Sequence, residues 1–429
     1  MSEPISAPWP QPAIPATAPV AVHAPSWQQA LLDLPASATP AQCDATVADW
    51  AQRCWRDLCA ALPQQQHVVL AHPGQAQAPA RIYMASAQAS GWLHAPLHAT
   101  AQAPRWRADS SDGLLQHGQQ AAAQGFCGAE AGLHAAAAVF AELDGAAPAT
   151  PTPARHAKHT GHANAGGLHW QRRYFPLLGA PRAQAFAPMP AAMLQAGHAH
   201  GLYAVMGDAE WTIRCMELGV RLVQLRIKHA APDDIDAQIA RCAQAAHACG
   251  ALLIINDHWQ AALRLAQRMP GIYGVHLGQD DAAALTQEAL DALQASGLRL
   301  GVSSQTLWEL ARALRLRPSY IACGPVYATQ TKTDIELPPM GLHNVRFWAH
   351  ILHGSIAEQN APALPLVAIG GMDAERAQAT AAAGADSVAV VSHITQAANP
   401  AQAIAALQQA IAAGQSTCQQ AHGAGPAAA

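Results

Sequence analysis

Residues 252–266, LLIINDHWQAALRLA, hold the pattern on which the fold depends. Their first four residues are apolar, which predicts a short strand that is buried on both of its faces. Asn256 and Asp257 follow at once, and the apolar residues after them recur at helical spacing. The stretch is therefore typical of one strand–helix unit, with polar side chains at the carboxyl end of its strand.

Units of this kind recur along the second half of the chain. Runs that predict strands lie at residues 201–206, 221–228, 252–257, 274–279, 298–304, 320–326, 364–371 and 387–394. Because segments with helical periodicity separate these runs, the strands should pair in parallel. Eight such units predict an α/β protein with a (β/α)8 barrel. A doubly wound open sheet is the alternative, but the count of eight and the lack of a G-x-G-x-x-G motif after the first strand disfavour it.

The first half of the chain has a different composition, rich in Ala, Pro, His and Gln, and its periodicity is weak. With 429 residues, the chain is longer than a single hydrophobic core usually serves, so we expect two domains. The predicted divisions are a disordered Pro/Ala-rich tail (1–25), a smaller, Ala-rich and mainly helical region (26–147), a linker (148–198), the barrel (199–415) and a second disordered tail (416–429).

Composition argues against several classes of partner. A formal net charge of −4 gives no reason to expect nucleic acid or an anionic membrane as a ligand. No apolar run approaches the roughly 18 residues of a membrane helix, and the proline-rich start is unlike a signal peptide. The nine cysteines include no C-x-x-C pair, so we expect free thiols in a reducing cytoplasm. A homo-oligomer is left open.

Polar residues follow the predicted strands, at the end of a barrel where catalytic residues gather. Arg226 and Lys228 end the second strand, and two cations at the end of a buried strand need anionic partners. Asp257, Asp281 and Ser303 follow strands too, where any one of them alone would be explained as a helix N-cap. Their occurrence together favours a site for anions and a metal.

The cations and the carboxylates suit one kind of ligand. Arg226, Lys228 and Lys332 would clamp a diphosphate through their positive charges. Asp257 and Asp281 are hard oxygen ligands, suited to a Mg²⁺ that also takes phosphate oxygens. We therefore expect a diphosphate leaving group on this side of the barrel.

A second anion site is expected on the other side. Gly371, Val391 and Ser392 lie at the last two strand ends, where barrels commonly bind a phosphate through backbone N–H groups. Thr329 and Thr331 add hydroxyl groups after the sixth strand. A diphosphate site beside a monophosphate site indicates transfer of an alkyl group with loss of pyrophosphate.

Seven motifs resemble the thiamine-phosphate synthases in their order and spacing: QLRIK, IINDHWQAAL, GVHLGQDD, GVSSQT, GPVYATQTK, VAIGG and VAVVSHI. The resemblance covers roughly residues 200–413 and implies a (β/α)8 barrel. It implies a transferase of thiamine biosynthesis. The family joins 4-amino-2-methyl-5-hydroxymethylpyrimidine diphosphate to the ring nitrogen of 4-methyl-5-(2-phosphoethyl)thiazole, with Mg²⁺, and releases pyrophosphate. A thiazole tautomerase-like protein or a regulatory protein on the same barrel is the alternative.

The resemblance also implies roles for the matching residues. The catalytic residues would be Arg226, Lys228 and Lys332, and Mg²⁺ would be bound by Asp257 and Asp281. The pyrimidine diphosphate would contact Gln224, Leu225, Arg226, Ile227, Lys228, Asn256, Ser303 and Lys332. The thiazole phosphate would contact Thr329, Gln330, Thr331, Gly371, Val391 and Ser392.

The first half resembles, faintly, the end of the hydroxymethylpyrimidine (phosphate) kinases of the ribokinase type, which are sometimes fused to this synthase. The phosphate loop of those kinases would correspond to residues 109–113, DSSDG, which lack the leading glycines and add a carboxylate at Asp109. The resemblance thus implies a degenerate ribokinase-like α/β remnant without kinase activity. An unrelated helical extension and a bifunctional kinase and synthase are the alternatives.

Overall fold

The computed structural model describes residues 20–24, 40–62, 65–71, 81–95, 110–123, 128–143, 174–228, 231–329, 338–353 and 363–423. The chain divides into two compact units. The first contains Met1–Arg182, Thr306–Arg315 and Gly354–Ala361, and the second contains Ala183–Gln305, Leu316–His353 and Pro362–Ala429.

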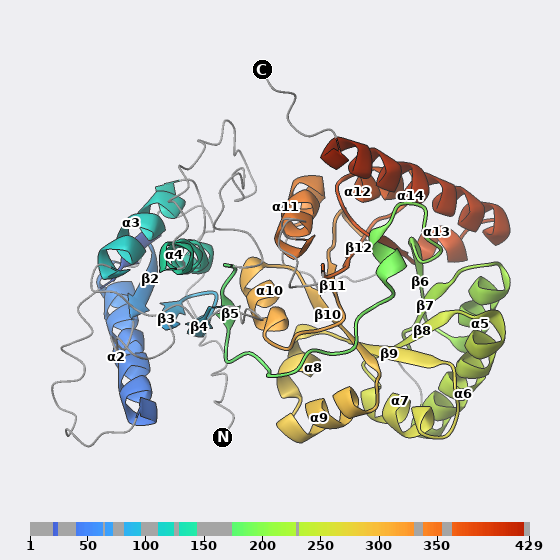
Figure 1. Ribbon diagram of the computed structural model, residues 1–429, viewed down its shortest axis with the longest axis horizontal. Coiled ribbons are helices and arrows are strands. Elements are labelled where there is room, and N and C mark those ends of the chain that lie inside the picture. The colour runs from blue at the N-terminus through green and yellow to red at the C-terminus, as the bar shows by residue number, and fades with distance from the viewer. Residues whose placement is uncertain are drawn as a thin grey trace. The chain divides into compact units, whose positions relative to one another are not determined.

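In the second unit, eight described strands form a closed parallel barrel (Figure 1). They are β6 (Leu202–Met206), β7 (Leu222–Leu225), β8 (Leu252–Asn256), β9 (Ile272–Leu277), β10 (Arg299–Ser304), β11 (Tyr320–Cys323), β12 (Leu366–Ile369) and β13 (Ser387–Val390). The last strand pairs with the first, with Ala389 opposite Tyr203, so this sheet has no free edge. The predicted (β/α)8 barrel is confirmed, and the open sheet is excluded.

Helices follow the strands of the barrel along the chain. They are α5 (Ala209–Glu217), α6 (Pro232–Cys249), α7 (Trp259–Ala266), α8 (Gln279–Ala284), α9 (Gln287–Ala295), α10 (Leu307–Leu314), α11 (Gly341–His353), α12 (Ala374–Ala382), α13 (Ser392–Thr395) and α14 (Pro400–Gly423). Local signals set their ends. The Asp208 carboxylate caps α5 by accepting from the Trp211 N–H at 2.8 Å, and α6 ends at Gly250, whose left-handed φ of 63° suits glycine. Within the described ranges, no helix has the length and apolar character that crossing a bilayer requires.

The end of the barrel where its strands begin is packed by a segment that precedes β6. Met189 and Met193, the latter in the short helix η2 (Ala191–Leu194), are buried against Tyr203 and Tyr320. The Ser319 hydroxyl donates to the Ala187 carbonyl at 2.7 Å and fastens the segment to the start of β11. Within residues 183–198, which were expected to be part of a linker, Met189 and Met193 are therefore part of the barrel's core.

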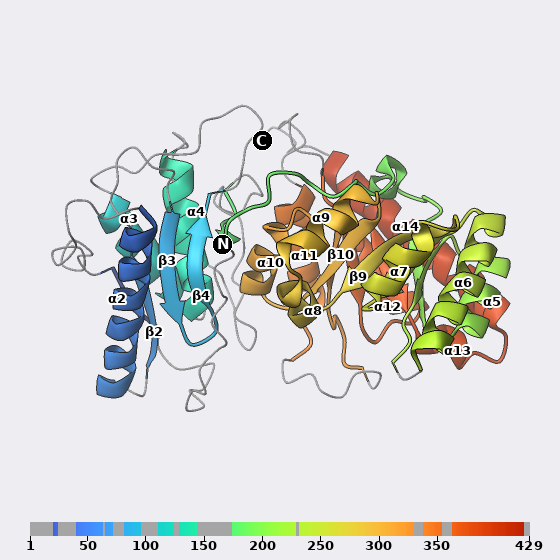
Figure 2. The ribbon, with the colours of Figure 1, turned by 90° about the horizontal axis from the view of Figure 1, so that it is seen from below.

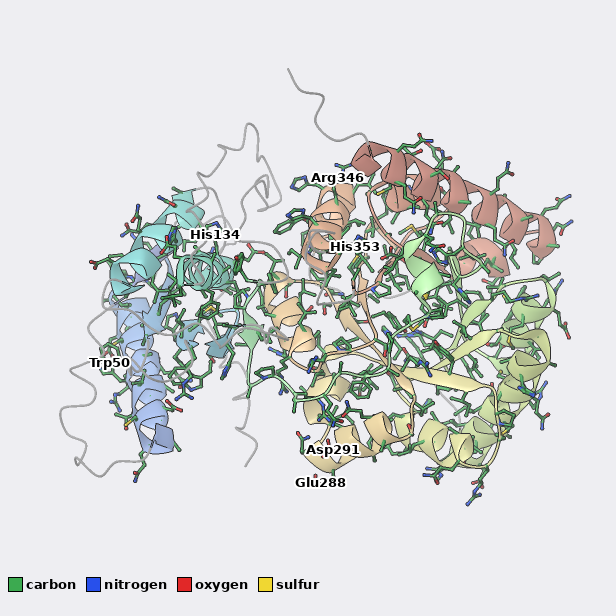
Figure 3. All side chains as sticks on the ribbon, in the orientation of Figure 1. Trp50, His134, Glu288, Asp291, Arg346 and His353 are labelled. Carbon is green, nitrogen blue, oxygen red and sulfur yellow. The ribbon has the colours of Figure 1, made fainter. Side chains whose placement is uncertain are left out.

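The C-terminal helix is tied to the same end of the barrel. Gln415, which is 6 % exposed, accepts from the Gly197 N–H at 2.9 Å and donates to the Asp386 carbonyl at 2.7 Å. The Asp386 carboxylate in turn pairs at 2.8 Å with His353 of α11. Figure 3 labels His353. The structure differs here from the sequence prediction of a disordered tail from 416, because α14 continues to Gly423.

The first unit contains a mixed sheet whose described strands lie in the order β1 (Val20–His23), β2 (Gln66–Ala71), β3 (Arg81–Ser86), β4 (Ser90–His94) and β5 (Leu177–Leu178). The first pair is parallel and the remaining pairs are antiparallel. Among the described residues before β5, the helices that cover it are α2 (Pro40–Ala61), α3 (Ser110–Ala123) and α4 (Gly128–Leu143), with α2 and α4 on opposite faces (Figure 2).

Alternation of side chains along the strands explains this layering. Val69 and Tyr83 face α2 and pack on Trp55. Met84 faces α4, where Gly132 allows close approach, since a Cβ there would lie 2.6 Å from the Met84 sulfur. The helices expected in this region are present, and the sheet beneath them makes the region α/β. The strands of this sheet were not predicted.

Candidate active site

The carboxyl ends of the strands bring the described candidate residues to one rim of the barrel. β7, β8, β9 and β10 are consecutive neighbours, and they carry the residues predicted for the pyrimidine diphosphate and the metal. β11, β12 and β13 are consecutive too, and they lead to Thr329, Gly371, Val391 and Ser392. Gln330, Thr331 and Lys332 lie outside the described residues.

Buried and exposed side chains alternate just after β7. Leu225 and Ile227 are buried, whereas Arg226 is partly exposed and Lys228 is exposed. The backbone N–H of Arg226 donates to the Met206 carbonyl at 2.7 Å, which extends the β6–β7 pairing to the rim. This bond fixes the backbone of Arg226 at the mouth of the barrel, two residues before Lys228.

Asp257 does not have the role of a helix cap. His258 is the N-cap residue of α7, and no side chain caps that helix. Asp257 instead adopts a left-handed backbone conformation with φ 62°, which is uncommon for any residue other than glycine and tends to persist at functional sites. Its N–H donates to the His276 carbonyl at 3.0 Å, so the residue is fixed between the ends of β8 and β9.

The charge of Asp281 affects the pKa of Asp257, the other carboxylate predicted to bind the metal. Asp281 lies in the first turn of α8, whose N-cap is Gly278 and which has no side-chain cap. Partial desolvation, followed by the negative charge of Asp281, raises the pKa of Asp257 above its ordinary value, although Arg226 acts in the opposite direction. A divalent cation between the carboxylates would remove this repulsion.

A hydrogen-bonded network crosses the interior of the barrel beneath the rim. Gln224 Nε2 donates to the Tyr203 hydroxyl at 2.9 Å, and that hydroxyl lies 3.0 Å from the hydroxyl of Tyr320. The Tyr320 hydroxyl is 2.9 Å from His276 Nδ1, and His276 Nε2 is 2.7 Å from Ser303 Oγ. We call these five residues the interior network. Burial, the larger cause, and the charge of Arg226 lower the pKa of His276 to about 4, so its imidazole is neutral.

The turn after β12 is fastened to the segment that leads to Thr329. Gly371 has φ 65°, and a Cβ at this position would lie 2.5 Å from the Ala328 carbonyl oxygen, so only glycine fits. Tyr327 N–H donates to the Gly370 carbonyl at 3.2 Å. Arg376 donates to the Gly371 carbonyl at 2.8 Å while its guanidinium lies over the Tyr327 ring. Gly371 is therefore adjacent to the segment that leads to Thr329.

Comparisons with known proteins match this half of the chain. A family model described as thiamine monophosphate synthase matches residues 202–394. The chain is 41% identical to the thiamine-phosphate synthase of Neisseria meningitidis serogroup A over 206 residues, which are 48% of this chain and 92% of that protein. It belongs to the thiamine-phosphate synthase family. The enzyme of Salmonella typhimurium is 42% identical over 207 residues, 48% of this chain and 90% of its own length.

Among solved structures, a thiamine phosphate pyrophosphorylase from Pyrococcus furiosus covers 50% of this chain and 96% of its own, with 24% sequence identity and a TM-score of 0.41. The segment matched by the thiamine-phosphate synthase model begins at residue 202, so the match does not include the sheet of the first unit, which ends at Leu178.

The donor set at the rim suits magnesium. No group of three or more His, Cys, Asp or Glu side chains that would bind a metal occurs among the residues with described positions. Mg²⁺ does not need such a cage, because it commonly takes one or two carboxylates and completes its shell with water and substrate phosphate oxygens. Asp257 and Asp281 in this thiamine-phosphate synthase family member fit that requirement.

Reasoning from the sequence missed most of the interior network. Tyr203 and Tyr320 stand inside apolar runs and were counted only as part of buried strands. The signal that could have found them is a hydroxyl-bearing side chain at the centre of a strand buried on both faces, since such a group must find a partner.

Proposed function

We propose that this chain joins 4-amino-2-methyl-5-(diphosphooxymethyl)pyrimidine to 4-methyl-5-(2-phosphoethyl)thiazole and releases thiamine phosphate and pyrophosphate. The observation that carries the proposal is the identity of 41% over 92% of a thiamine-phosphate synthase, in a barrel whose described strand ends lead to Arg226, Lys228, Asp257 and Asp281. The matched relatives are synthases, and no observation favours a tautomerase, a regulatory protein or an added kinase activity.

The bond changes are simple. The carbon–oxygen bond between the pyrimidine methylene group and the diphosphate breaks, and the thiazole nitrogen forms a new bond to that carbon. Pyrophosphate takes the electron pair of the broken bond. The electron-rich aminopyrimidine stabilises positive charge on the methylene carbon, so no residue need act as a covalent nucleophile.

The cations stabilise the pyrophosphate as it departs. Arg226 and Lys228 stand at the end of β7, and we assign Lys332 to the same task from its sequence position. Charge that develops in the transition state is stabilised most effectively by groups already in place, which the ordered backbone at Arg226 provides.

Asp257 and Asp281 would hold Mg²⁺. When bound, the ion neutralises negative charge on the pyrophosphate oxygens. The mutual repulsion of the two carboxylates and the strained backbone of Asp257 support this assignment. Gln224, Asn256 and Ser303, with the backbone of Leu225 and Ile227, would bind the rest of the pyrimidine substrate.

The thiazole phosphate would bind where the β12 turn meets the segment after β11. The adjacency of Gly371 to Tyr327 and Ala328 supports a joint site for Thr329, Gly371, Val391 and Ser392. We assign Gln330 and Thr331 to the same site from their sequence positions. Because two substrates are held at neighbouring parts of one rim, much of the barrier is overcome by proximity.

The catalytic domain in this proposal extends beyond the predicted 199–415. The second unit begins at Ala183, Met189 and Met193 belong to the barrel's core, and α14 continues to Gly423, so we place its bounds at 183 and 423. We place the protein in the cytoplasm, in keeping with the free thiols of its eight described cysteines.

The test uses the purified full chain with both substrates and Mg²⁺, and follows thiamine phosphate and pyrophosphate. Both products should appear in equal amounts and only when Mg²⁺ is present. Failure to form either product while both substrates bind would overturn the assignment.

A further inference from the structure

The interior network is a continuous series of hydrogen bonds supplied by five strands. Gln224 lies on β7, Tyr203 on β6, Tyr320 on β11, His276 on β9 and Ser303 on β10. The exposed fractions of Gln224, Tyr203, Tyr320 and His276 are 4 %, 1 %, 1 % and 5 %. Water therefore has little access to the four, and their polar atoms must satisfy one another.

The direction of every bond in the network follows from its first link. A phenol has one hydrogen to donate, and a neutral imidazole has one donor and one acceptor nitrogen. Because Gln224 Nε2 donates to Tyr203, the Tyr203 hydrogen goes to Tyr320 and the Tyr320 hydrogen goes to His276 Nδ1. His276 then carries its own hydrogen on Nε2 and donates to Ser303 Oγ.

No single link can reverse alone. One reversed hydrogen would place two hydrogens between one pair of groups and none between another pair, which leaves buried polar groups unsatisfied. Reversing all links at once requires the Gln224 amide to turn over, both tyrosine hydroxyls to rotate and His276 to change tautomer. The network thus holds one polarity.

This polarity fixes what the two ends offer to a ligand. Gln224 directs one of its two amide N–H groups to Tyr203, which turns the amide nitrogen towards the network and leaves the amide oxygen as the acceptor of this end. Ser303 accepts from His276, which leaves its hydroxyl hydrogen as a donor. The two ends always have opposite character, since a network that runs in one direction starts with a donor and finishes with an acceptor.

We propose that Tyr203, Tyr320 and His276 are positioning residues that fix Gln224 as an acceptor and Ser303 as a donor, and so select a 4-aminopyrimidine over its 4-oxo analogue. This inference rests on the proposed function, which places Gln224 and Ser303 at the pyrimidine substrate. In an aminopyrimidine the exocyclic nitrogen donates and the adjacent ring nitrogen accepts. In the oxo form both are reversed, because the oxygen accepts and the ring N–H donates.

The main experiment measures kcat/KM for the 4-amino diphosphate and for its 4-oxo analogue, with thiazole phosphate and Mg²⁺ saturating. The wild-type chain should prefer the amino substrate by about 100-fold or more, as expected for a site built to hydrogen-bond its ligand. Tyr320→Phe, which breaks the network at its centre, should reduce that preference to about tenfold or less. Its KM for thiazole phosphate should not change.

Tyr273→Phe is the matched control. Tyr273 lies on β9 like His276, but its ring packs against the Arg299 guanidinium and it takes no part in the network. This variant should keep the wild-type preference. Equal preference in wild type and Tyr320→Phe would overturn the proposal, whereas a wild-type chain that makes no thiamine phosphate would overturn the proposed function instead.

Two further measurements keep the test decisive if Tyr320→Phe does not fold. Tyr203→Phe breaks the adjacent link and should lower the same preference. In the wild-type chain, the ¹⁵N spectrum of labelled histidine, assigned with His276→Gln, should show His276 protonated on Nε2. Protonation on Nδ1 would contradict the stated polarity without any tyrosine variant.

Discussion

The hydroxyl oxygens of Tyr203 and Tyr320 lie 3.0 Å apart in the centre of the barrel, and each tyrosine is 1 % exposed. Their strands, β6 and β11, are not neighbours in the barrel order, so the bond crosses the interior. A buried hydroxyl pair of this kind makes each partner dependent on the other, because removal of one takes away one of the two hydrogen bonds of the other.

This dependence predicts coupling in a double-mutant cycle. Tyr203→Phe and Tyr320→Phe should each lower the free energy of unfolding of the barrel by about 1–3 kcal/mol, because each leaves a buried polar group unsatisfied. The double variant should lose less than the sum, by about 1 kcal/mol. Urea unfolding of the three variants measures this, and strictly additive losses would show that the two hydroxyls do not interact.

Substitution of Asp281 should reduce the rate of the reaction, whereas the same substitution at the adjacent Asp280 should not. Asp281→Asn should lower kcat/KM about 100-fold or more, since a metal ligand supplies several kcal/mol of transition-state stabilisation. It should also raise the Mg²⁺ concentration needed for half-maximal rate. Asp280→Asn, in the same turn of α8 but outside the proposed metal site, is the control and should behave like wild type. Equal effects of the two substitutions would remove Asp281 from the metal site.

Two arginines at opposite ends of β7, Arg226 and Arg221, should differ in their effect on turnover. Arg226→Ala should reduce turnover about 100- to 1,000-fold, the range seen when one preorganised charge-stabilising group is removed. Arg221 precedes β7 at the opposite end of the barrel, where it donates to the Met216 carbonyl at 3.1 Å, and Arg221→Ala should leave kcat unchanged. Steady-state rates with both substrates test the pair, and a loss confined to thiazole phosphate binding would mean that Arg226 is misassigned.

The lowered pKa of His94 predicts that the free energy of unfolding of the first unit depends on pH. Burial and, secondarily, the charge of Arg81 lower the pKa of His94 from 6.5 to about 4. Between these values the unfolded chain binds a proton that the folded chain does not, so stability falls as the pH drops from 6.5 towards 4. The loss from this one group is about 3 kcal/mol.

The measurement compares unfolding of the wild-type chain and of His94→Gln across this pH range. Glutamine cannot titrate, so the variant should show the shallower dependence. Parallel pH profiles would indicate that His94 does not change its protonation on unfolding.

The barrel was predictable because its signals are local. Each strand is a short apolar run, and the polar residues follow it directly, so both the fold and the rim residues such as Asp257 could be located from spacing. The direction of the interior network was not predictable, since Tyr203 and Tyr320 lie more than a hundred positions apart and meet only when the barrel closes.

The other misses have the same cause. Met189 and Met193 stand in a Pro- and Ala-rich stretch that looks like a linker, and only the barrel that they cap shows them to be core residues. The strands around Val69 and Met84 are short and lie among Ala and Gln, so their pairing within a sheet is a tertiary property.

Two truncations distinguish the barrel core from the chain that precedes it. Deletion of residues 1–182 should leave turnover intact, because Phe186, Met189 and Met193 remain to pack the barrel. Deletion of residues 1–198 removes all three, and each buried methionine lost should cost about 2–5 kcal/mol, so that barrel should unfold at a lower temperature or fail to fold. The full-length Met189→Ala/Met193→Ala variant is the control, which removes the same side chains and keeps the first unit. If the shorter deletion abolishes turnover while the barrel stays folded, the first unit contributes to the activity and is not a remnant.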